Sequence, residues 1–533
     1  MSQDAASPSG PLATPAAGAD APCSARERPL VLAATILASS MVFIDGTVAN
    51  VALPALQREF GASAADMQWV IESYALFLAS LLLVGGSAGD RYGRRRVFLV
   101  GVVLFAAASA ACGLASSIDQ LILARAVQGV GGALLVPGSL ALISASFEPG
   151  IRGKAIGTWS GYTAITGAMG PVIGGLLIEH WSWRAAFLLN VPLAVAVVFL
   201  TLRHVRESRG RNAPGRLDWF GAALASAGLG ALVGGLILAS TAGWRDLRVA
   251  GLLLLGALAL AAFVLQERRH PAPLLPLGLF RSRDFSGANL MTLLLYAALG
   301  GSLYFLPLNL IQVHGYTALE AGSALLPFIL TMFLLSRWAG TLVDRYGSRN
   351  PLVIGPTIAA VGFVLFALPS TGGSYWLTFF PAALVLGLGM TISVAPLTTT
   401  VMNALDASQA GAASGVNNAV SRLAALLAVA LFGIVMSSAF GHALAGLAGE
   451  VSPAVMQKVL AQQDKLAAAG VPPQASEAEA VLVRKAIGAA FVHGFRWVML
   501  MAAMLALASA FSAWRMIGGK AAGKVDGKRP EPS

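Results

Sequence analysis

The segment GSAGDRYGRRR at residues 86–96 has a second copy in GTLVDRYGSR at residues 340–349. Both copies contain the pattern Gly-x-x-x-Asp-Arg-Tyr-Gly, and each follows a long apolar run. The second copy begins roughly half a chain length after the first. Parallel halves related by an axis along the membrane normal are a recurrent membrane-protein architecture. The repeat therefore predicts two similar helical halves, each with a tight turn on the same side of a bilayer.

The composition indicates that the bilayer is the solvent of this chain. Of its 533 residues, 56% are hydrophobic and 11% are charged, whereas soluble domains carry roughly 25% charged residues. A net charge of +11 would suggest nucleic acid in a soluble protein, but here the distribution of arginines over the turns explains it. The two cysteines, Cys23 and Cys112, cannot form a disulfide framework or a metal cluster. The sequence contains no phosphate-binding loop and no catalytic triad, so we expect neither an enzyme nor a cofactor.

Apolar runs recur along the whole chain, and spanning a bilayer takes about 20 such residues. An all-α membrane protein with about fourteen transmembrane helices is predicted, and the count depends on the runs at 217–240 and 248–266. The predicted spans are 30–56, 66–88, 97–117, 119–145, 155–178, 185–203, 217–240, 248–266, 286–311, 320–341, 351–370, 375–402, 410–440 and 486–517.

The distribution of Lys and Arg predicts the orientation in the membrane. Basic stretches such as RYGRRR (91–96) and RHVRESRGR (203–211) all fall on one side if both termini are cytoplasmic. On the opposite side, the loop 441–485 contains Ser452 before Pro453, and Ser476 and Glu479 at capping-box spacing. We expect two short surface helices there, as a solvated cover rather than a lid.

The predicted domains follow from these spans. They are a disordered tail at 1–28, a six-helix bundle at 29–203, basic loops with two linking helices at 204–283, a second six-helix bundle at 284–518 with the loop 441–485, and a disordered basic tail at 519–533.

Within the repeat, each residue type has a physical use. Gly86 is expected to let two helices approach closely, Gly93 to allow the tight turn, and Asp90 to cap a neighbouring helix N-terminus. The alternative is that RYGRRR serves only as a topology anchor, although this does not explain the aspartate or the repetition.

Several further motifs stand in order along the chain. They are FIDGTVANVALP at 43–54, LILARAVQGVGGA at 121–133, GPVIGG at 170–175 and WSWRAAFLLNVP at 181–192. Together with the repeat, they make the sequence similar to the major facilitator superfamily of transporters, and within it to the fourteen-helix drug:proton antiporters of the multidrug efflux type. The resemblance covers about residues 29–517. Thr166 departs from it, because the family pattern often has glycine there.

The resemblance implies roles for the matching residues. It implies two six-helix halves with two additional linking helices. The conformational-switch residues are Gly86, Asp90, Arg91, Gly93 and Arg94 with Asp344, Arg345 and Gly347; the helix-4 motif residues are Gln128 and Gly129; and the helix-5 antiporter motif residues are Gly170, Pro171, Gly174 and Gly175.

Three charged residues are candidates for proton coupling. Asp45 lies inside a membrane span, where a carboxylate costs on the order of 2.5–3.5 kcal/mol and is functional by default. Arg125 stays protonated, so its use would be to hold a carboxylate; the resemblance implies a coupling role, and a purely structural ion pair is the alternative. Glu72 falls at a similar depth, but it belongs to no family motif, and it could instead be an interfacial acid held beside Trp69 and Tyr74.

Other polar residues could line a substrate cavity between the halves, although polar groups in bundles often only bond neighbouring helices. These candidates are Tyr74, Asn289, Tyr296 and Asn309. Arg337 and Arg422 are assigned to packing or topology near helix ends.

The sequence therefore predicts a proton-coupled exporter of small amphipathic or hydrophobic compounds in a bacterial inner membrane. One alternative is an exporter dedicated to a single metabolite such as a siderophore or antibiotic, and another is a non-transporting receptor or scaffold. Expected partners are protons, a small-molecule substrate and the lipid bilayer; nucleic acid is not expected, and a periplasmic adaptor protein is left open. We expect a monomer.

Overall fold

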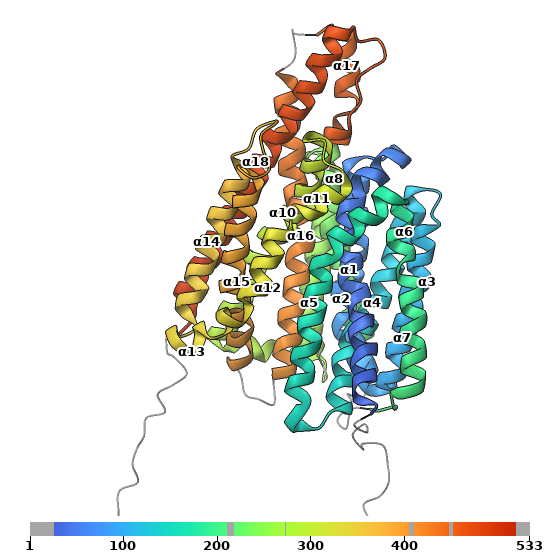
Figure 1. Ribbon diagram of the computed structural model, residues 1–533, viewed down its shortest axis with the longest axis vertical. Coiled ribbons are helices and arrows are strands. Elements are labelled where there is room, and N and C mark those ends of the chain that lie inside the picture. The colour runs from blue at the N-terminus through green and yellow to red at the C-terminus, as the bar shows by residue number, and fades with distance from the viewer. Residues whose placement is uncertain (1–25, 210–217, 272, 405–409, 447–450, 519–533) are drawn as a thin grey trace, which may run out of the picture.

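The computed structural model describes residues 26–209, 218–271, 273–404, 410–446 and 451–518. Within these ranges, fourteen helical segments are long and apolar enough to cross a membrane. Both ends of the described chain lie at one end of the bundle, which we call the terminal end; the opposite end, where α17 lies, is the α17 end (Figure 1). An even number of crossings requires this arrangement.

The N-terminal group contains seven helices that make six crossings, because α6 and α7 share one. α2 and α3 pack on α4, whereas α1 packs on α5 and α7. Its core is made of fully buried side chains such as Phe98, Phe105 and Leu142. The helices are α1 (Arg28–Phe60), α2 (Ala64–Tyr92), α3 (Arg94–Gly113), α4 (Ile118–Ser146), α5 (Pro149–His180), α6 (Trp183–Leu188) and α7 (Asn190–His204).

The C-terminal group is built in a similar way from the second half of the chain. α14 packs on α15 and α18, α10 packs on α16 and α18, and α12 packs on α15. The elements are the 3-10 turn η1 (Leu277–Arg281), α10 (Arg283–Leu308), the π-helical turn η2 (Asn309–Val313), α11 (Ala318–Ser323), α12 (Leu326–Gly340), α13 (Leu342–Tyr346), α14 (Arg349–Ala367), α15 (Phe379–Asn403), α16 (Ala410–Ala445) and α18 (Glu477–Met516).

Two helices link the groups, α8 (Trp219–Ala242) and α9 (Leu247–Arg269). They pack on each other, and α8 also packs on α2 and α16. The linking pair therefore lies beside the seam between the two groups, outside both bundles.

The two groups meet through α5 against α11 and through α2 against α16. Gly175 of α5 is in close contact with α11, since a Cβ atom there would lie 2.5 Å from the carbonyl oxygen of Ala318. Towards the terminal end of α5, a Cβ atom at Gly157 or Gly161 would meet nothing within 4 Å. In this conformation the contact between α5 and the C-terminal group is thus made near the α17 end.

A short segment covers the seam at that end. α17 (Pro453–Leu460) is followed by η4 (Gln463–Ala468), which contacts α1, α2, η2, α16 and α18. Gln57 of α1 donates from Nε2 to the carbonyl of Lys465 (3.1 Å) and accepts from Gln312 Nε2 (2.9 Å). Leu466 is buried and has φ 53°, a conformation that costs a branched side chain energy and is kept only where packing enforces it. The cover is therefore hydrogen-bonded to α1, and Gln57 connects it to η2 of the C-terminal group.

All fourteen predicted spans correspond to helical segments that are long and apolar enough to cross a membrane, and the expected all-helical fold is confirmed for the described residues. One element differs. The capping box of Ser476 and Glu479 is present, but it begins the 40-residue helix α18 rather than a second short surface helix. The first expected surface helix is α17, with Ser452 as its N-cap. Most of the tail at 1–28 and all of the tail at 519–533 lie outside the described residues.

Candidate functional site: a buried ion pair and its polar shell

The centre of the N-terminal group contains an ion pair between Asp45 of α1 and Arg125 of α4. The side chains are 1% and 0% exposed. Burying a lone charge is far more expensive than burying a pair whose remaining hydrogen-bonding groups are satisfied. The pair therefore explains how the apolar helix α1 carries an aspartate in the middle of its span.

Two further side chains donate to the same carboxylate. Gln128 Nε2 lies 2.8 Å from Asp45 Oδ1, and Asn190 Nδ2 lies 3.2 Å from it. Asn190 also donates to Ser109 Oγ (3.0 Å), so α7 and α3 are joined to the site. Gln128 is one turn of α4 beyond Arg125, and Asn190 begins α7 directly after the break that separates α6 from α7. Asp45 thus accepts hydrogen bonds from three side chains, which come from α4 and α7.

The guanidinium group of Arg125 is held by neutral groups as well as by the carboxylate. Its Nη1 donates to Gln128 Oε1 (2.8 Å), and its Nε donates to the backbone carbonyl of Val70 (3.1 Å). Its Cζ lies 4.2 Å from the centre of the Tyr74 ring, at cation–π distance. Its Nη2 is buried and has no hydrogen-bond partner among the described residues. Arg125 therefore has contacts on α2 and α4 in addition to its ion pair with α1.

Glu72 does not join this network. It is 0% exposed, and neither of its carboxylate oxygens has a hydrogen-bond partner in the described part of the chain. It lies within electrostatic range of Tyr304 on α10, which belongs to the other group. The alternative interpretation, an interfacial acid in an aromatic belt, is wrong because the side chain is fully buried.

The repeated turns each contain a glycine with positive φ that ends a helix. Gly93 has φ 113° and Gly347 has φ 73°, and each donates its N–H to the carbonyl four residues earlier. The preceding Arg-Tyr pairs also match, because Arg91 lies over Tyr92 (5.5 Å) and Arg345 lies over Tyr346 (5.4 Å). The side chain of Asp344 lies outside the described part of the chain.

Two details of the first turn differ from the prediction. Asp90 does not cap a helix: it accepts from Arg94 Nε (2.8 Å), and Glu207 caps α3 by accepting from the backbone N–H groups of Arg95 (3.0 Å) and Arg96 (3.2 Å). The closest approach of α2 to α4 is at Gly85 rather than Gly86. A Cβ atom at Gly85 would lie 2.0 Å from a backbone oxygen of α4, whereas one at Gly86 would be at an ordinary 3.5 Å from Pro137.

The glycines of the motifs on α4 and α5 lie at helix contacts. A Cβ atom at Gly129 would lie 2.4 Å from the carbonyl oxygen of Tyr74, and one at Gly170 would lie 1.9 Å from Thr47 Oγ1 of α1. Gly174 also faces α1, at Val48. Pro171 lies inside α5, and its carbonyl contacts Gly322 of α11. One face of α5 therefore packs against α1, and the adjacent face packs against α11 of the C-terminal group.

The predicted cavity residues are mostly closed to solvent in this conformation. Tyr74, Asn289 and Asn309 are 5%, 3% and 2% exposed, and Tyr296 is half-buried. Asn289 accepts a hydrogen bond from Asn417 (3.3 Å). This residue therefore bonds a neighbouring helix, as the alternative interpretation holds.

Arg422 is a residue that the sequence interpretation placed wrongly. It lies well inside the candidate span Gly415–Ala445, and its Cζ is 5.9 Å from the ring of Phe43, two residues before Asp45. Within the described residues it has no hydrogen bond and no ion pair. The predicted span 410–440 already places it twelve residues from the start of the helix, so its assignment to a helix end is wrong although the start of the span is correct. The side chain of Arg337 lies outside the described part.

Two helical groups with repeated turns, a buried charge pair and a seam that is closed at one end define a polytopic membrane transporter. A sequence model described as Major Facilitator Superfamily matches residues 35–429, and the chain belongs to this superfamily.

Similar proteins extend over nearly the whole chain. The "Tetracenomycin C resistance and export protein" of Streptomyces glaucescens is 35% identical over 94% of this chain and 93% of its own length. The "Multidrug efflux pump LfrA" of Mycolicibacterium smegmatis is 32% identical over 90% and 94%. A crystal structure of a bacterial homologue of the human lysosomal transporter Spinster matches with a TM-score of 0.65 at 20% identity, covering 93% of this chain and 98% of that one. The last comparison supports the fold alone.

Proposed function

We propose that this chain is an exporter that expels small amphipathic or hydrophobic compounds in exchange for protons. The observation that carries the proposal is the buried pair of Asp45 and Arg125, because it places a hydrogen-bonded titratable group in the middle of the N-terminal group. The direction of transport is supported by the relatives, whose names describe resistance, export and efflux.

The pair can couple a proton to a conformational change through its hydrogen bonds. A neutral carboxyl group accepts fewer hydrogen bonds than a carboxylate, so a proton on Asp45 weakens its contacts with Gln128 and Asn190. Those contacts join α1 to α4 and α7, and α1 in turn packs on α5, which contacts the C-terminal group. Protonation of Asp45 would therefore weaken the contacts within the N-terminal group, which forms one side of the seam.

The proton must reach Asp45 in another conformation, since the pair is closed to solvent here. Each proton that enters is worth about 2.3 kcal/mol per 100 mV of membrane potential. At about 1.4 kcal/mol per decade, this supports a gradient of roughly 40-fold for a neutral solute.

Arg422 is the second part of the proposal. Arg422 belongs to the C-terminal group, and its guanidinium group lies near Phe43 of the N-terminal group, at the depth of the ion pair. It has no counter-ion in the described chain. An unpaired guanidinium group there would favour substrates that carry an acidic group.

An exporter dedicated to one compound is the second candidate. It is favoured by relatives whose names give a single antibiotic, such as the tetracenomycin C protein and the "Cephamycin export protein CmcT" of Amycolatopsis lactamdurans. In either case we place the termini in the cytoplasm and the α17 end outside. Proton coupling by Glu72 and an adaptor partner are left open, and a monomeric state remains a prediction.

The test is a susceptibility panel of acidic, neutral and cationic antibiotics in an efflux-deficient bacterium that expresses the chain. Protection against several unrelated compounds favours multidrug export, whereas protection against one favours the dedicated exporter. Each active compound is then added to everted vesicles that hold a pH gradient, and dissipation of the gradient by substrate shows the exchange. Protection without any effect on the gradient would contradict the proton coupling.

The role of Arg422 is tested with two substitutions. Arg422→Gln should lose protection against the acidic compounds only, and Arg422→Lys should restore it.

A further inference from the structure

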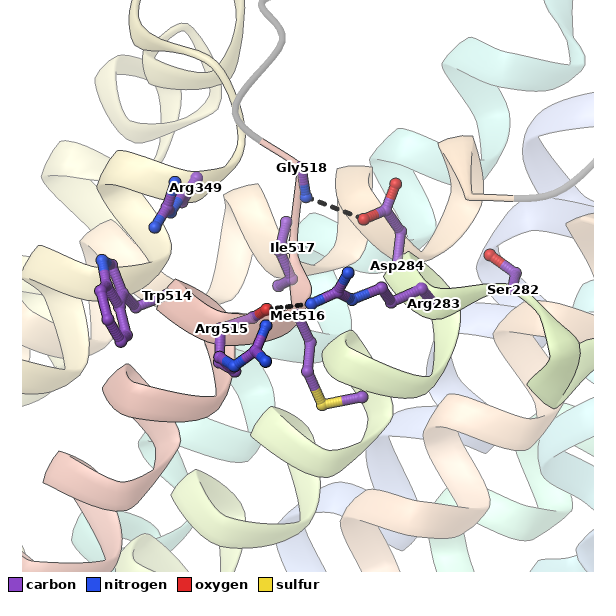
Figure 2. A pocket seen from close by; sticks show the side chains of 9 residues that line it. All are labelled: Ser282, Arg283, Asp284, Arg349, Trp514, Arg515, Met516, Ile517 and Gly518. Atoms are coloured by element: carbon purple, nitrogen blue, oxygen red, sulfur yellow. Dashed lines mark hydrogen bonds between the residues drawn. The ribbon is translucent and has the colours of Figure 1, made fainter.

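A pocket of about 660 Å³ opens at the terminal end of the C-terminal group, away from the ion pair. Figure 2 shows three arginine side chains around it, each from a different helix: Arg283 begins α10, Arg349 begins α14, and Arg515 lies in the last turn of α18. α18 packs directly on both α10 and α14, so the pocket is a point where the ends of the three helices converge.

The arginines of this pocket have no carboxylate partner among the described residues. Arg283 Nη2 donates to the backbone carbonyl of Arg515 (2.7 Å), and Arg349 lies 5.7 Å from the ring of Trp514. The single acid, Asp284, accepts instead from the backbone N–H of Gly518 (2.8 Å). Three guanidinium groups and one carboxylate leave the pocket with a net positive charge.

Within the described residues, the three guanidinium groups therefore lack a counter-ion. Like charges that share a pocket repel each other, and guanidinium groups that converge from separate elements are a usual way to bind a phosphate. The first turns of α10 and α14 also point their positive ends into this region, which adds to the attraction for an anion.

The neighbouring surface indicates the level of the pocket in the bilayer. Trp514 is 51% exposed, and Phe511, about one turn earlier, is 62% exposed, with the ring centres 5.7 Å apart. Exposed tryptophan at the end of a transmembrane helix marks the boundary between acyl chains and headgroups. The pocket therefore has an aromatic edge for a lipid chain beside a cationic site for a headgroup.

We propose that this pocket binds the phosphate headgroup of an anionic phospholipid from the leaflet at the terminal end. Basic pockets between transmembrane helices on the cytoplasmic side are known sites for such headgroups. The headgroup would connect the ends of α10, α14 and α18. Because Arg349 follows Gly347 of the repeated turn by two residues, the lipid would also be next to the conformational switch of the C-terminal group. The proposal depends on a membrane-embedded fold and not on the compound that is exported.

The experiment measures binding to the purified full chain in detergent, by titration with short-chain phosphatidylglycerol and by thermal melting. Phosphatidylcholine and sodium phosphate are separate arms. We expect phosphatidylglycerol to bind and to raise the melting temperature, while phosphatidylcholine has little effect. Binding should weaken by about tenfold or more in Arg515→Gln, and further in the double variant Arg349→Gln/Arg515→Gln.

The matched control is Arg268→Gln/Arg269→Gln, which removes two exposed charges from the last turn of α9 at the same end of the bundle. Equal weakening in this control would mean that general surface charge attracts the lipid, and would overturn the site. Equal stabilisation by sodium phosphate would show that the pocket binds a free anion instead. If the double variant does not fold, Arg515→Gln alone decides, because its side chain is exposed and makes no side-chain hydrogen bond within the described chain.

Discussion

Three charged residues in the membrane region differ in how they are satisfied. Asp45 has three donors, Arg422 has one aromatic ring, and Glu72 has no hydrogen-bond partner among the described residues. The energetic consequence of a substitution depends on these partners more than on depth, since removing one member of a buried pair leaves the other uncompensated. Substitutions at Asp45, at its partner Arg125 and at Glu72 are therefore expected to have different effects.

Asp45→Asn should abolish proton-linked efflux while the protein remains in the membrane. The amide cannot take up a proton in the relevant range, and it leaves Arg125 without a counter-charge, at a cost of about 3–5 kcal/mol. Substrate-dependent dissipation of a pH gradient in vesicles measures the loss. Asp119→Asn is the control, because this acid lies exposed on the same helix as Arg125. Equal transport by Asp45→Asn and the unmodified chain would remove Asp45 from the coupling role.

Arg125→Lys should keep partial activity with a shifted pH optimum, and Arg125→Ala should be inactive. Lysine retains the charge beside Asp45, but it lacks the planar fork that contacts Asp45, Gln128 and Val70 together. The measurement is efflux as a function of external pH. Full activity of Arg125→Ala would show that the pair has only a structural role.

Glu72→Met should leave transport in place and raise thermal stability. A buried polar group without a hydrogen bond costs about 1–3 kcal/mol, and methionine fills a similar volume without that penalty. Thermal melting of the purified protein and efflux in the same panel give the two readouts. If stability rises but proton-linked efflux stops, Glu72 belongs to the coupling machinery after all, as one of the sequence interpretations holds.

At the scale of elements, the repeated turns join helices that must move together. Asp90 at the end of α2 holds Arg94 at the start of α3, and Glu207 from beyond α7 binds the first N–H groups of α3. The turn is therefore tied to three helices of one group and lies far along α2 from the ion pair.

Substitution of Asp90 or Arg94 should slow turnover of all substrates alike. The contact joins two helices on the turn and does not reach the substrate, so it affects the rate of the conformational change rather than selectivity. Initial efflux rates for several compounds, expressed relative to one another, measure this. Arg268→Gln, which removes an exposed charge from the last turn of α9 at the same end of the bundle, is the control. A changed ranking of substrates in Asp90→Asn would contradict the assignment.

The elements also show what one sequence can predict. Runs of apolar residues fix where helices cross, and the spacing of the motifs placed Asp45 and Arg125 at one depth, where they do meet. Rotation about each helix axis was not available. For that reason the sequence interpretation groups Glu72 with a pair it does not join and names Gly86 where Gly85 makes the close contact. Glu207, which caps α3, comes from a distant loop that no local pattern connects to that helix.

At the scale of the whole molecule, the closed end of the seam depends on backbone contact between α5 and α11. A Cβ atom at Gly175 would lie 2.5 Å from the Ala318 carbonyl oxygen, and one at Gly322 would lie 2.1 Å from that of Pro171. At this same end, η4 covers the gap and is hydrogen-bonded through Gln57. The conformation described here is therefore one in which the α17 end is sealed.

Gly175→Leu should shift the protein away from this sealed conformation. The added side chain has no room without separation of the two helices, and overpacking of this kind costs about 1–3 kcal/mol. Because about 1.4 kcal/mol is a tenfold change in an equilibrium constant, the open population should rise measurably. The reporter is Met67→Cys, a position that is 1% exposed beneath η4, labelled with a membrane-impermeant maleimide from the α17 side. Labelling should be faster in Gly175→Leu. Gly161→Leu makes the same change on the same helix where nothing lies within 4 Å, and it should leave the labelling rate unchanged. Equal rates in the two variants would show that the contact of α5 with α11 does not control access at the α17 end.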